Sequence, residues 1–378
     1  MSKILIFGDI CPTFDTKAAF DRGDRQAVFG EALPAIEEAD LVIGNLECAV
    51  TDTPKPINKT GPILHTNTQS LKTLKDFDAL SLANNHIRDC GDEGVMTAIE
   101  TCRKMGIKTF GAGKDIISSR VPMVIEKDSL KIGLMSFAEK EFNFATDKRP
   151  GASFLDPYYD FDRIRQFRTS VDYLIILYHG GIEYFQYPTP ELKRKCRKMV
   201  ECGANLVCCQ HSHCIGTIEE YQNSSIVYGQ GNSVFGYRQN DESWNRGLII
   251  EVDIQPQIEP HVPKAHVSYR AIMASDSGLK WMEPLAAKEL DMELKERANA
   301  SDEFIEEVWN KFCRDLGKIH LPLLLGWSRL FIAINRRTNN ALIKMLYGRV
   351  ASNATLNLIR CDVHREVIEH LLSSQNFK

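Results

Sequence analysis

Several features are missing from this 378-residue sequence, and each absence excludes a class of protein. There is no low-complexity tract, and 43% hydrophobic with 25% charged residues is typical of a globular chain with a large core. The apolar stretch from Leu321 to Trp327 is too short, and too interrupted by Pro322, to span a bilayer. Paired CxxC motifs, GxGxxG and P-loop spacings are also absent, which disfavours a zinc ribbon and a phosphate-cradling loop. The formal net charge of -4 indicates no particular partner, and we expect no nucleic acid among them.

The 11 cysteines are scattered along a long chain and do not form the dense framework of a small secreted domain. The N-terminus shows no charged leader followed by an apolar run and a small-residue cleavage site. We therefore expect a cytoplasmic protein whose thiols are reduced and mostly pack as small apolar residues.

Short apolar runs alternate with helical patterns, which predicts an α/β layered domain. Glycine at 106 and 203 is expected to end the two clearest helices, Gly94 to Met105 and Pro190 to Cys202. Six runs are typical of buried strands: Lys3–Phe7, Leu41–Ile43, Ala79–Leu82, Ile132–Met135, Tyr173–Leu177 and Asn205–Cys208.

Polar residues of ligand type follow five of these strands. They are Asp9, Asn45 with Glu47, Asn84-Asn85-His86, His179, and His211 with His213. Because the carboxyl ends of strands in an open α/β sheet line the ligand crevice, these side chains are expected to converge. Carboxylate, amide oxygen and imidazole together make a site for a divalent metal.

Each of these residues also has a structural explanation. Asp9 after a glycine is typical of a turn or a helix N-cap, and Glu47 alone is compatible with a solvated surface acid. Asn85 and His86 are compatible with a turn. His179 before two glycines is compatible with the start of a loop, and a single histidine at a strand end is usually structural. The pair His211 and His213 favours the metal hypothesis most, since alternate residues share one side of a strand-like segment.

The order of the motifs resembles a known family. The motifs are Gly8-Asp9, Gly44-Asn45-Leu46-Glu47, Ala83-Asn84-Asn85-His86 with Asp89 and Gly91, His179-Gly180-Gly181 with Glu183-Tyr184, His211-Ser212-His213 and Tyr228-Gly229-Gln230-Gly231-Asn232. Over residues 3 to 255 they resemble the poly-γ-glutamate capsule-synthesis (CapA-like) family, a branch of the calcineurin-like metallophosphatases. The resemblance implies a four-layer α/β/β/α sandwich with a two-metal phosphoesterase-type site at the strand ends.

The resemblance also assigns roles to individual residues. Asp9 and His213 are implied as ligands of a first metal, and Glu47 stands where a bridging aspartate is usual. Asn85, His179 and His211 are implied as ligands of a second metal.

His86 matches the histidine that protonates the leaving group, and Asp89 is placed to orient it. Two divalent ions are expected, with Mn, Fe or Zn favoured by this donor set. The wider superfamily has a histidine two residues after the first aspartate, where this chain has Cys11, so the first metal site is expected to be weak or vacant. Cys11 is expected to be an apolar turn residue and not a ligand.

These roles imply a metal-dependent hydrolase of phosphoesterase type that uses metal-activated water on a small anionic or polymeric substrate. Members of the family take part in capsule, polysaccharide or poly-γ-glutamate biosynthesis. The alternative is a non-catalytic binding or assembly component of a capsule or exopolysaccharide machinery. An unliganded histidine beside the metals favours the enzyme.

The chain changes character near residue 276, so we predict a main domain at 1–276 and a helical, basic extension at 277–378. An exposed helix is expected between residues 285 and 316, where charges of both signs alternate. From Leu316 to Arg360 there is no Asp or Glu, whereas Lys318, Arg329, Arg336, Arg337, Lys344, Arg349 and Arg360 are basic. This stretch is either a helical cap that packs on the main domain or a contact site for an anionic membrane surface, at the inner face, for a polymer or for a partner.

Overall fold

The structure is a computed structural model that describes most of the chain. The described residues are 2–59, 61–255, 264–324, 329–338, 340–346, 348–360, 364–365, 368 and 372. They divide into two compact units, Met1–Ala300 and Ser301–Lys378, and each unit is treated by itself.

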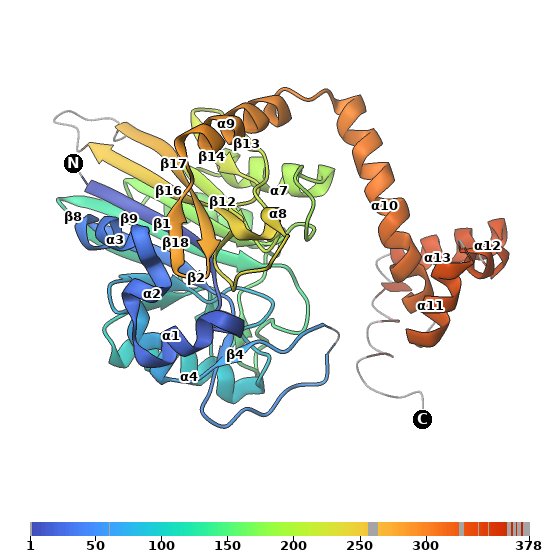
Figure 1. The fold of residues 1–378 in the computed structure, drawn as a ribbon, viewed down its shortest axis with the longest axis horizontal. Coiled ribbons are helices and arrows are strands. Elements are labelled where there is room, and N and C mark those ends of the chain that lie inside the picture. The colour runs from blue at the N-terminus through green and yellow to red at the C-terminus, as the bar shows by residue number, and fades with distance from the viewer. Residues whose placement is uncertain are drawn as a thin grey trace. The chain divides into compact units, whose positions relative to one another are not determined.

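The first unit is built on two large β-sheets (Figure 1). The eight-stranded sheet has the order β18-β17-β16-β1-β2-β5-β6, with β15 beside β1. Its strands are β1 (Ser2–Ile10), β2 (Leu41–Leu46), β5 (Ala79–Ser81), β6 (Lys108–Phe110), β15 (Asn232–Val234), β16 (Arg246–Gln255), β17 (Lys264–Ser275) and β18 (Gly278–Trp281).

The six-stranded sheet has the order β13-β14-β12-β11-β9-β8. Its strands are β8 (Met123–Lys127), β9 (Leu130–Ala138), β11 (Tyr173–His179), β12 (Leu206–Gln210), β13 (Ile218–Tyr221) and β14 (Ser224–Val227). Two small sheets pair β3 (Ala49–Val50) with β4 (His65–Thr66) and β7 (Ala112–Gly113) with β10 (Gly151–Ala152). In both large sheets the central strands are parallel, so their carboxyl ends share one edge.

Three apolar cores separate four layers. Alternate residues of the two sheets, such as Ile6 of β1 and Ile175 of β11, meet in a core between the sheets. The opposite face of the first sheet, including Phe7, packs against one set of helices, and the opposite face of the second sheet, including Ile176, packs against another. The predicted α/β/β/α sandwich is therefore confirmed.

The outer helical layers differ in size. The first sheet is covered by α1 (Lys17–Arg22), α2 (Arg25–Phe29), α3 (Leu33–Glu38) and α4 (Gly91–Lys104), and the second by α6 (Asp160–Arg168) and α7 (Pro190–Glu201). Shorter elements are α5 (Ile116–Ser119), α8 (Glu242–Asn245) and the 3-10 helices η1 (Phe14–Thr16), η2 (Gly30–Ala32) and η3 (Gln69–Leu74).

All six predicted buried strands are present, but β1 is longer than the sequence pattern indicates. It continues through Gly8 and Asp9 to Ile10, with an irregularity in its pairing to β2 between Ile6 and Asp9. A Cβ at Gly8 would lie 2.7 Å from the carbonyl oxygen of Gly231, so only glycine permits this close approach. The irregular segment therefore carries Asp9 into the interior without ending the strand.

The first unit extends past the predicted boundary at residue 276. Strand β18 pairs with β17, and α9 (Pro284–Ala298) buries Leu290 and Leu294 in the core between the sheets. The helix predicted as exposed at 285–316 is therefore two helices, and the first of them is partly buried.

The second unit is helical in its described part. Its helices are α10 (Asp302–Leu324), α11 (Arg329–Arg337), α12 (Ala341–Leu346) and α13 (Arg349–Arg360). Within the acid-free stretch, residues 325–328, 339 and 347 lie outside the described residues, including Trp327. No helix in the described part of the chain is long and apolar enough to cross a membrane.

Candidate metal centre

The strand ends of both sheets bring the predicted site residues together in the interior of the first unit. Asp9 lies in β1, and Glu47 directly follows β2. Asn85 and His86 follow β5, His179 ends β11, and the histidine pair follows β12. All eight predicted site residues are buried: Asp9, Glu47, Asn85, His86, Asp89, His179, His211 and His213.

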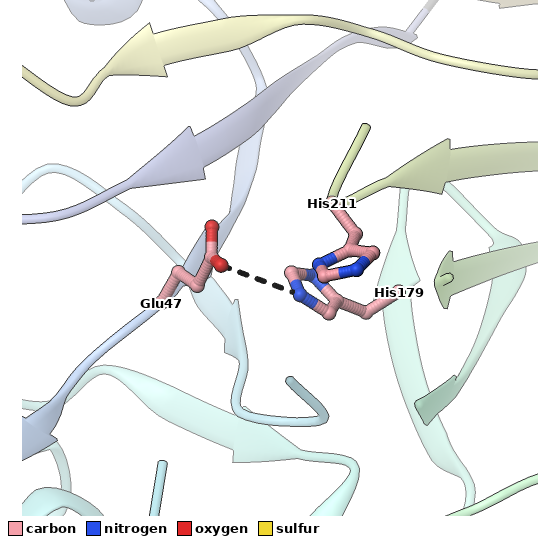
Figure 2. Close-up of side chains that lie close together, drawn as sticks. All are labelled: Glu47, His179 and His211. Carbon is pink, nitrogen blue, oxygen red and sulfur yellow. Dashed lines mark ion pairs between the residues drawn. The ribbon is translucent and has the colours of Figure 1, made fainter. Parts of the chain in front are cut away.

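Three overlapping groups of side chains offer ligand atoms within 4.8 Å of one another. Glu47, His179 and His211 form the group in Figure 2, where the side chains from three elements point toward one another. Asp9 and Glu47 form a second group with His213, and Glu183 forms a third with His211 and His213. Glu47 is common to the first two groups, and His213 is common to the second and third.

Glu47 is the residue whose surroundings most clearly indicate a cation. It is fully buried, and neither carboxylate oxygen accepts a hydrogen bond from the described residues. Its Oε1 lies 3.4 Å from His179 Nε2, and 4.0 Å from the Nε2 atoms of both His86 and His213. A buried carboxylate without a donor is costly, and a metal ion is the partner that suits imidazole and carboxylate ligands together.

The pKa values of both Glu47 and His179 lie above their ordinary values. Burial, and then repulsion by Asp9, raises the pKa of Glu47 to about 8. Burial opposes the charged form of His179, yet attraction to Glu47 and Asp9 raises the pKa of His179 to about 10. In the ion-free protein these protons neutralise negative charge, which a divalent cation would do instead.

The other two histidines are held in the neutral form that binds metals. Burial lowers the pKa of His211 well below its ordinary value and lowers the pKa of His213 to about 4. His213 Nδ1 lies 2.9 Å from Oδ1 of Asn232, while its Nε2 faces Glu47. An Nδ1–H donated to Asn232 leaves the lone pair of Nε2 for a metal.

The histidine pair converges through a turn and not through a continued strand. Strand β12 ends at Gln210, and His211 and His213 adopt left-handed φ values of 89° and 51°. The expectation of a strand-like segment at these residues is therefore wrong. His211 N–H donates to Oδ2 of Asp9 at 2.9 Å, which ties the turn to β1. Such left-handed residues in a buried turn are typical of functional sites.

Asparagine side chains hold the neighbouring strand ends in place. Asn45 Nδ2 donates to Oδ1 of Asp9 at 2.7 Å, and Asn84 Nδ2 donates to the carbonyl oxygen of Leu46 at 2.7 Å. Asn85 Oδ1 lies 3.0 Å from His179 Nε2, so the amide oxygen faces the same point as the carboxylate of Glu47. The loop after β5 is thus fixed to β2 while Asn85 projects into the site.

His86 and Asp89 form a pair beside the three groups. His86 Nδ1 lies 2.6 Å from Asp89 Oδ2, which also accepts the backbone N–H of Leu64 at 2.7 Å. His86 belongs to none of the three groups found among the described residues. Burial lowers the pKa of His86, although Asp89 opposes this shift.

Lys59 is a buried member of the site that the sequence pattern does not reveal. Its Nζ lies 2.5 Å from Asp89 Oδ1 and 3.2 Å from His86 Nδ1. The side chains of Lys59 and Asp89 are only 3% and 1% exposed. A lysine in an irregular loop between prolines carries no periodic signal, so only the tertiary structure identifies it.

Cys11 packs in the apolar core as expected. It is fully buried, and its sulfur lies 3.3 Å from Oγ1 of Thr13. Burial, and then the neighbouring Cys48, raises the pKa of the Cys11 thiol, which keeps it protonated. It belongs to none of the three groups, and a protonated thiol is a poor metal ligand.

Comparison with known proteins identifies the family to which this chain belongs. The family model described as bacterial capsule synthesis protein PGA_cap matches residues 3–237. PGA biosynthesis protein CapA of Bacillus subtilis (strain 168) is 28% identical over 246 residues, which are 63% of this chain and 63% of that protein. Capsule biosynthesis protein CapA of Bacillus anthracis is 25% identical over 250 residues, which are 63% of this chain and 60% of that protein.

This chain thus matches less than two thirds of the length of either relative. Among solved structures, a 5'-nucleotidase precursor from Thermus thermophilus superposes with a TM-score of 0.37 at 12% identity. That superposition covers 78% of this chain and 58% of the other.

Proposed function

This chain belongs to the bacterial capsule synthesis protein PGA_cap family, and we propose that it is a metal-dependent hydrolase of phosphoesterase type that acts in the synthesis of a capsule polymer. The observation that carries the proposal is the fully buried carboxylate of Glu47, which lacks a hydrogen-bond donor and faces three histidines. The names of the relatives, which refer to PGA and capsule biosynthesis, support an anionic or polymeric substrate.

The residues fit two divalent ions. Asp9, Glu47 and His213 would hold one, and Glu47, Asn85, His179 and His211 would hold the other. When bound, such ions act as Lewis acids that activate water and neutralise charge on a phosphoryl group. Mn, Fe or Zn suits this mixture of imidazole and oxygen donors.

The residues of the chain supply orientation and proton transfer. Asn232 fixes the ring of His213, and Asn45 together with the His211 N–H fixes the carboxylate of Asp9. His86, oriented by Asp89, is free of the ligand groups and is placed to give a proton to a leaving oxygen.

The alternative is a non-catalytic component of a capsule or exopolysaccharide machinery. To distinguish the two, the purified full-length protein is loaded in turn with Mn²⁺, Fe²⁺ and Zn²⁺ and assayed with phosphomonoester, phosphodiester and γ-glutamyl peptide substrates. We expect ion-dependent phosphoester hydrolysis that His211→Ala abolishes. If the loaded wild type hydrolyses none of these substrates, the binding role is the better account.

A second role, membrane contact, is supported by the second unit. Leu330, Met345 and Val350 are 68%, 74% and 84% exposed, in a stretch from residue 316 to residue 360 that contains no acid. Exposed apolar side chains next to basic ones suit an anionic lipid surface.

The test is co-sedimentation with anionic and neutral vesicles at two salt concentrations. Each basic residue near such a surface contributes about 1 kcal/mol at low salt, so a variant with Arg336, Arg337 and Lys344 all changed to Glu is expected to lose binding. The matched control changes Lys72, Lys104 and Lys108, which are exposed in the first unit, to Glu and should keep its binding. No preference of the wild type for anionic vesicles would contradict the membrane role.

A further inference from the structure

The first metal site has too few protein donors if only the sequence-predicted residues are counted. Asp9, Glu47 and His213 offer three ligand side chains. The pattern of the wider metallophosphatase superfamily places a histidine where this chain has Cys11, which is buried in the apolar core beside Thr13. A fourth donor would have to come from elsewhere in the chain.

Glu183 approaches this site from the loop that follows β11. One of its carboxylate oxygens lies within 4.8 Å of the ligand atoms of both His211 and His213. The loop is held there by the backbone N–H of Tyr184, which donates to the carbonyl oxygen of Ser212 at 2.7 Å. Tyr184 has a left-handed φ of 62°, so the loop turns sharply just after Glu183.

Glu183 is the exposed member of its group, whereas His211 and His213 are buried. None of the hydrogen bonds and ion pairs seen in the described part of the chain involves Glu183, so its carboxylate is available to a cation. The neighbouring group of Asp9, Glu47 and His213 shares His213 with it, and there the two oxygens of Glu47 also lack donors.

We propose that Glu183 is the fourth protein ligand of the ion held by Asp9, Glu47 and His213, and supplies the donor that Cys11 does not. This inference rests on the proposed function, because it assumes the two-ion site. Three carboxylates with one imidazole make a harder donor set than the site of Glu47, Asn85, His179 and His211, so this position is expected to favour Mn²⁺ over Zn²⁺.

The test is equilibrium binding of Mn²⁺ to the chelator-stripped full-length protein, read by metal analysis and by the electron paramagnetic resonance of free Mn²⁺. We expect two ions per wild-type chain and one tight ion in Glu183→Gln. The affinity of the other position is expected to fall by more than the ~10–100-fold typical of a lost outer-shell partner. Glu191→Gln, an exposed glutamate in the first turn of α7, is the matched control and should keep both ions.

Cys11→Ala separates the two candidate donors. We expect Cys11→Ala to retain both ions. If Cys11→Ala loses an ion and Glu183→Gln loses none, the inference is overturned. The inference is also overturned if the wild type and Glu183→Gln bind the same number of ions with the same affinity, but this result leaves the hydrolase proposal standing. A wild type that binds no ion would overturn both. Thermal melting of each variant confirms that it is folded.

Discussion

His213 and Asn232 are joined by a 2.9 Å contact between Nδ1 and Oδ1, on the side of the imidazole ring away from Glu47. The contact sets which nitrogen carries the proton, and it links the turn after β12 to strand β15. The motif from Tyr228 to Asn232 therefore fixes the orientation of the His213 ring.

Removal of this contact should weaken metal binding without removing a ligand. We expect Asn232→Leu to lower the affinity for Mn²⁺ by about 10–100-fold, as is typical for a lost outer-shell partner. Asn232→Asp keeps an acceptor for the Nδ1–H and should retain most of the affinity. Competition with a fluorescent chelator measures both variants, and equal affinity of the leucine variant and wild type would contradict the orienting role.

His86→Ala should separate catalysis from metal binding. Because His86 lies outside the ligand groups, the variant is expected to keep its full metal content. If His86 donates a proton to the leaving group, turnover should fall by about 10²–10⁴-fold, and less with a substrate whose leaving group needs no proton. Loss of metal from the variant would show instead that His86 is a ligand.

Lys59→Met should destabilise the fold, because it leaves the buried carboxylate of Asp89 without its cation. Breaking a buried ion pair typically costs ~3–5 kcal/mol in the free energy of unfolding, which urea denaturation measures. Lys55→Met is the matched control, since Lys55 pairs with Glu93 on the surface and both side chains are well exposed. Removal of the Lys59 charge should also raise the pKa of His86, visible as a shifted pH–rate profile. Equal stability of the two variants would contradict the buried pairing.

The ion-free protein should lose stability as the pH rises above neutrality. In the folded state the pKa of Glu47 is raised from 4.5 to about 8 and that of His179 from 6.5 to about 10. The stabilising contribution of each group is therefore complete below its unfolded value and is lost as the pH rises through the folded one.

We expect urea unfolding in the presence of a chelator to show a falling free energy of unfolding between pH 6.5 and about 10. A bound divalent ion would displace these protons and flatten the dependence. Glu47→Gln, which cannot ionise, should show a shallower decline. An ion-free wild type whose stability is flat or rises over this range would contradict the proton-holding arrangement.

The strands and most of the buried site residues could be predicted because each strand contains an apolar run and the polar residues lie at or just beyond its carboxyl end. Glu47 directly follows β2, and Asp9 and His179 lie in the last residues of β1 and β11. Glu183 stands in one of the family-like motifs, but its position beside the histidine pair could not be predicted, because its loop is fixed by a tertiary hydrogen bond from Tyr184 to Ser212. Lys59 also comes from an irregular loop, and its contacts with Asp89 and His86 leave no signal in the sequence. His211 and His213 were predicted as site residues, but on a strand-like segment and not on a turn. Left-handed φ values at these two residues leave no signature in a His-Ser-His sequence.

The most direct test of the account is the metal content of wild type and of the double variant His179→Ala/His211→Ala, measured by mass spectrometry after chelation and reloading. The account predicts near-stoichiometric Mn, Fe or Zn in the wild type, with a marked loss in the double variant, because two imidazoles of the Glu47 group are removed. Equal, stoichiometric metal in both proteins would contradict the assignment of the centre to these residues.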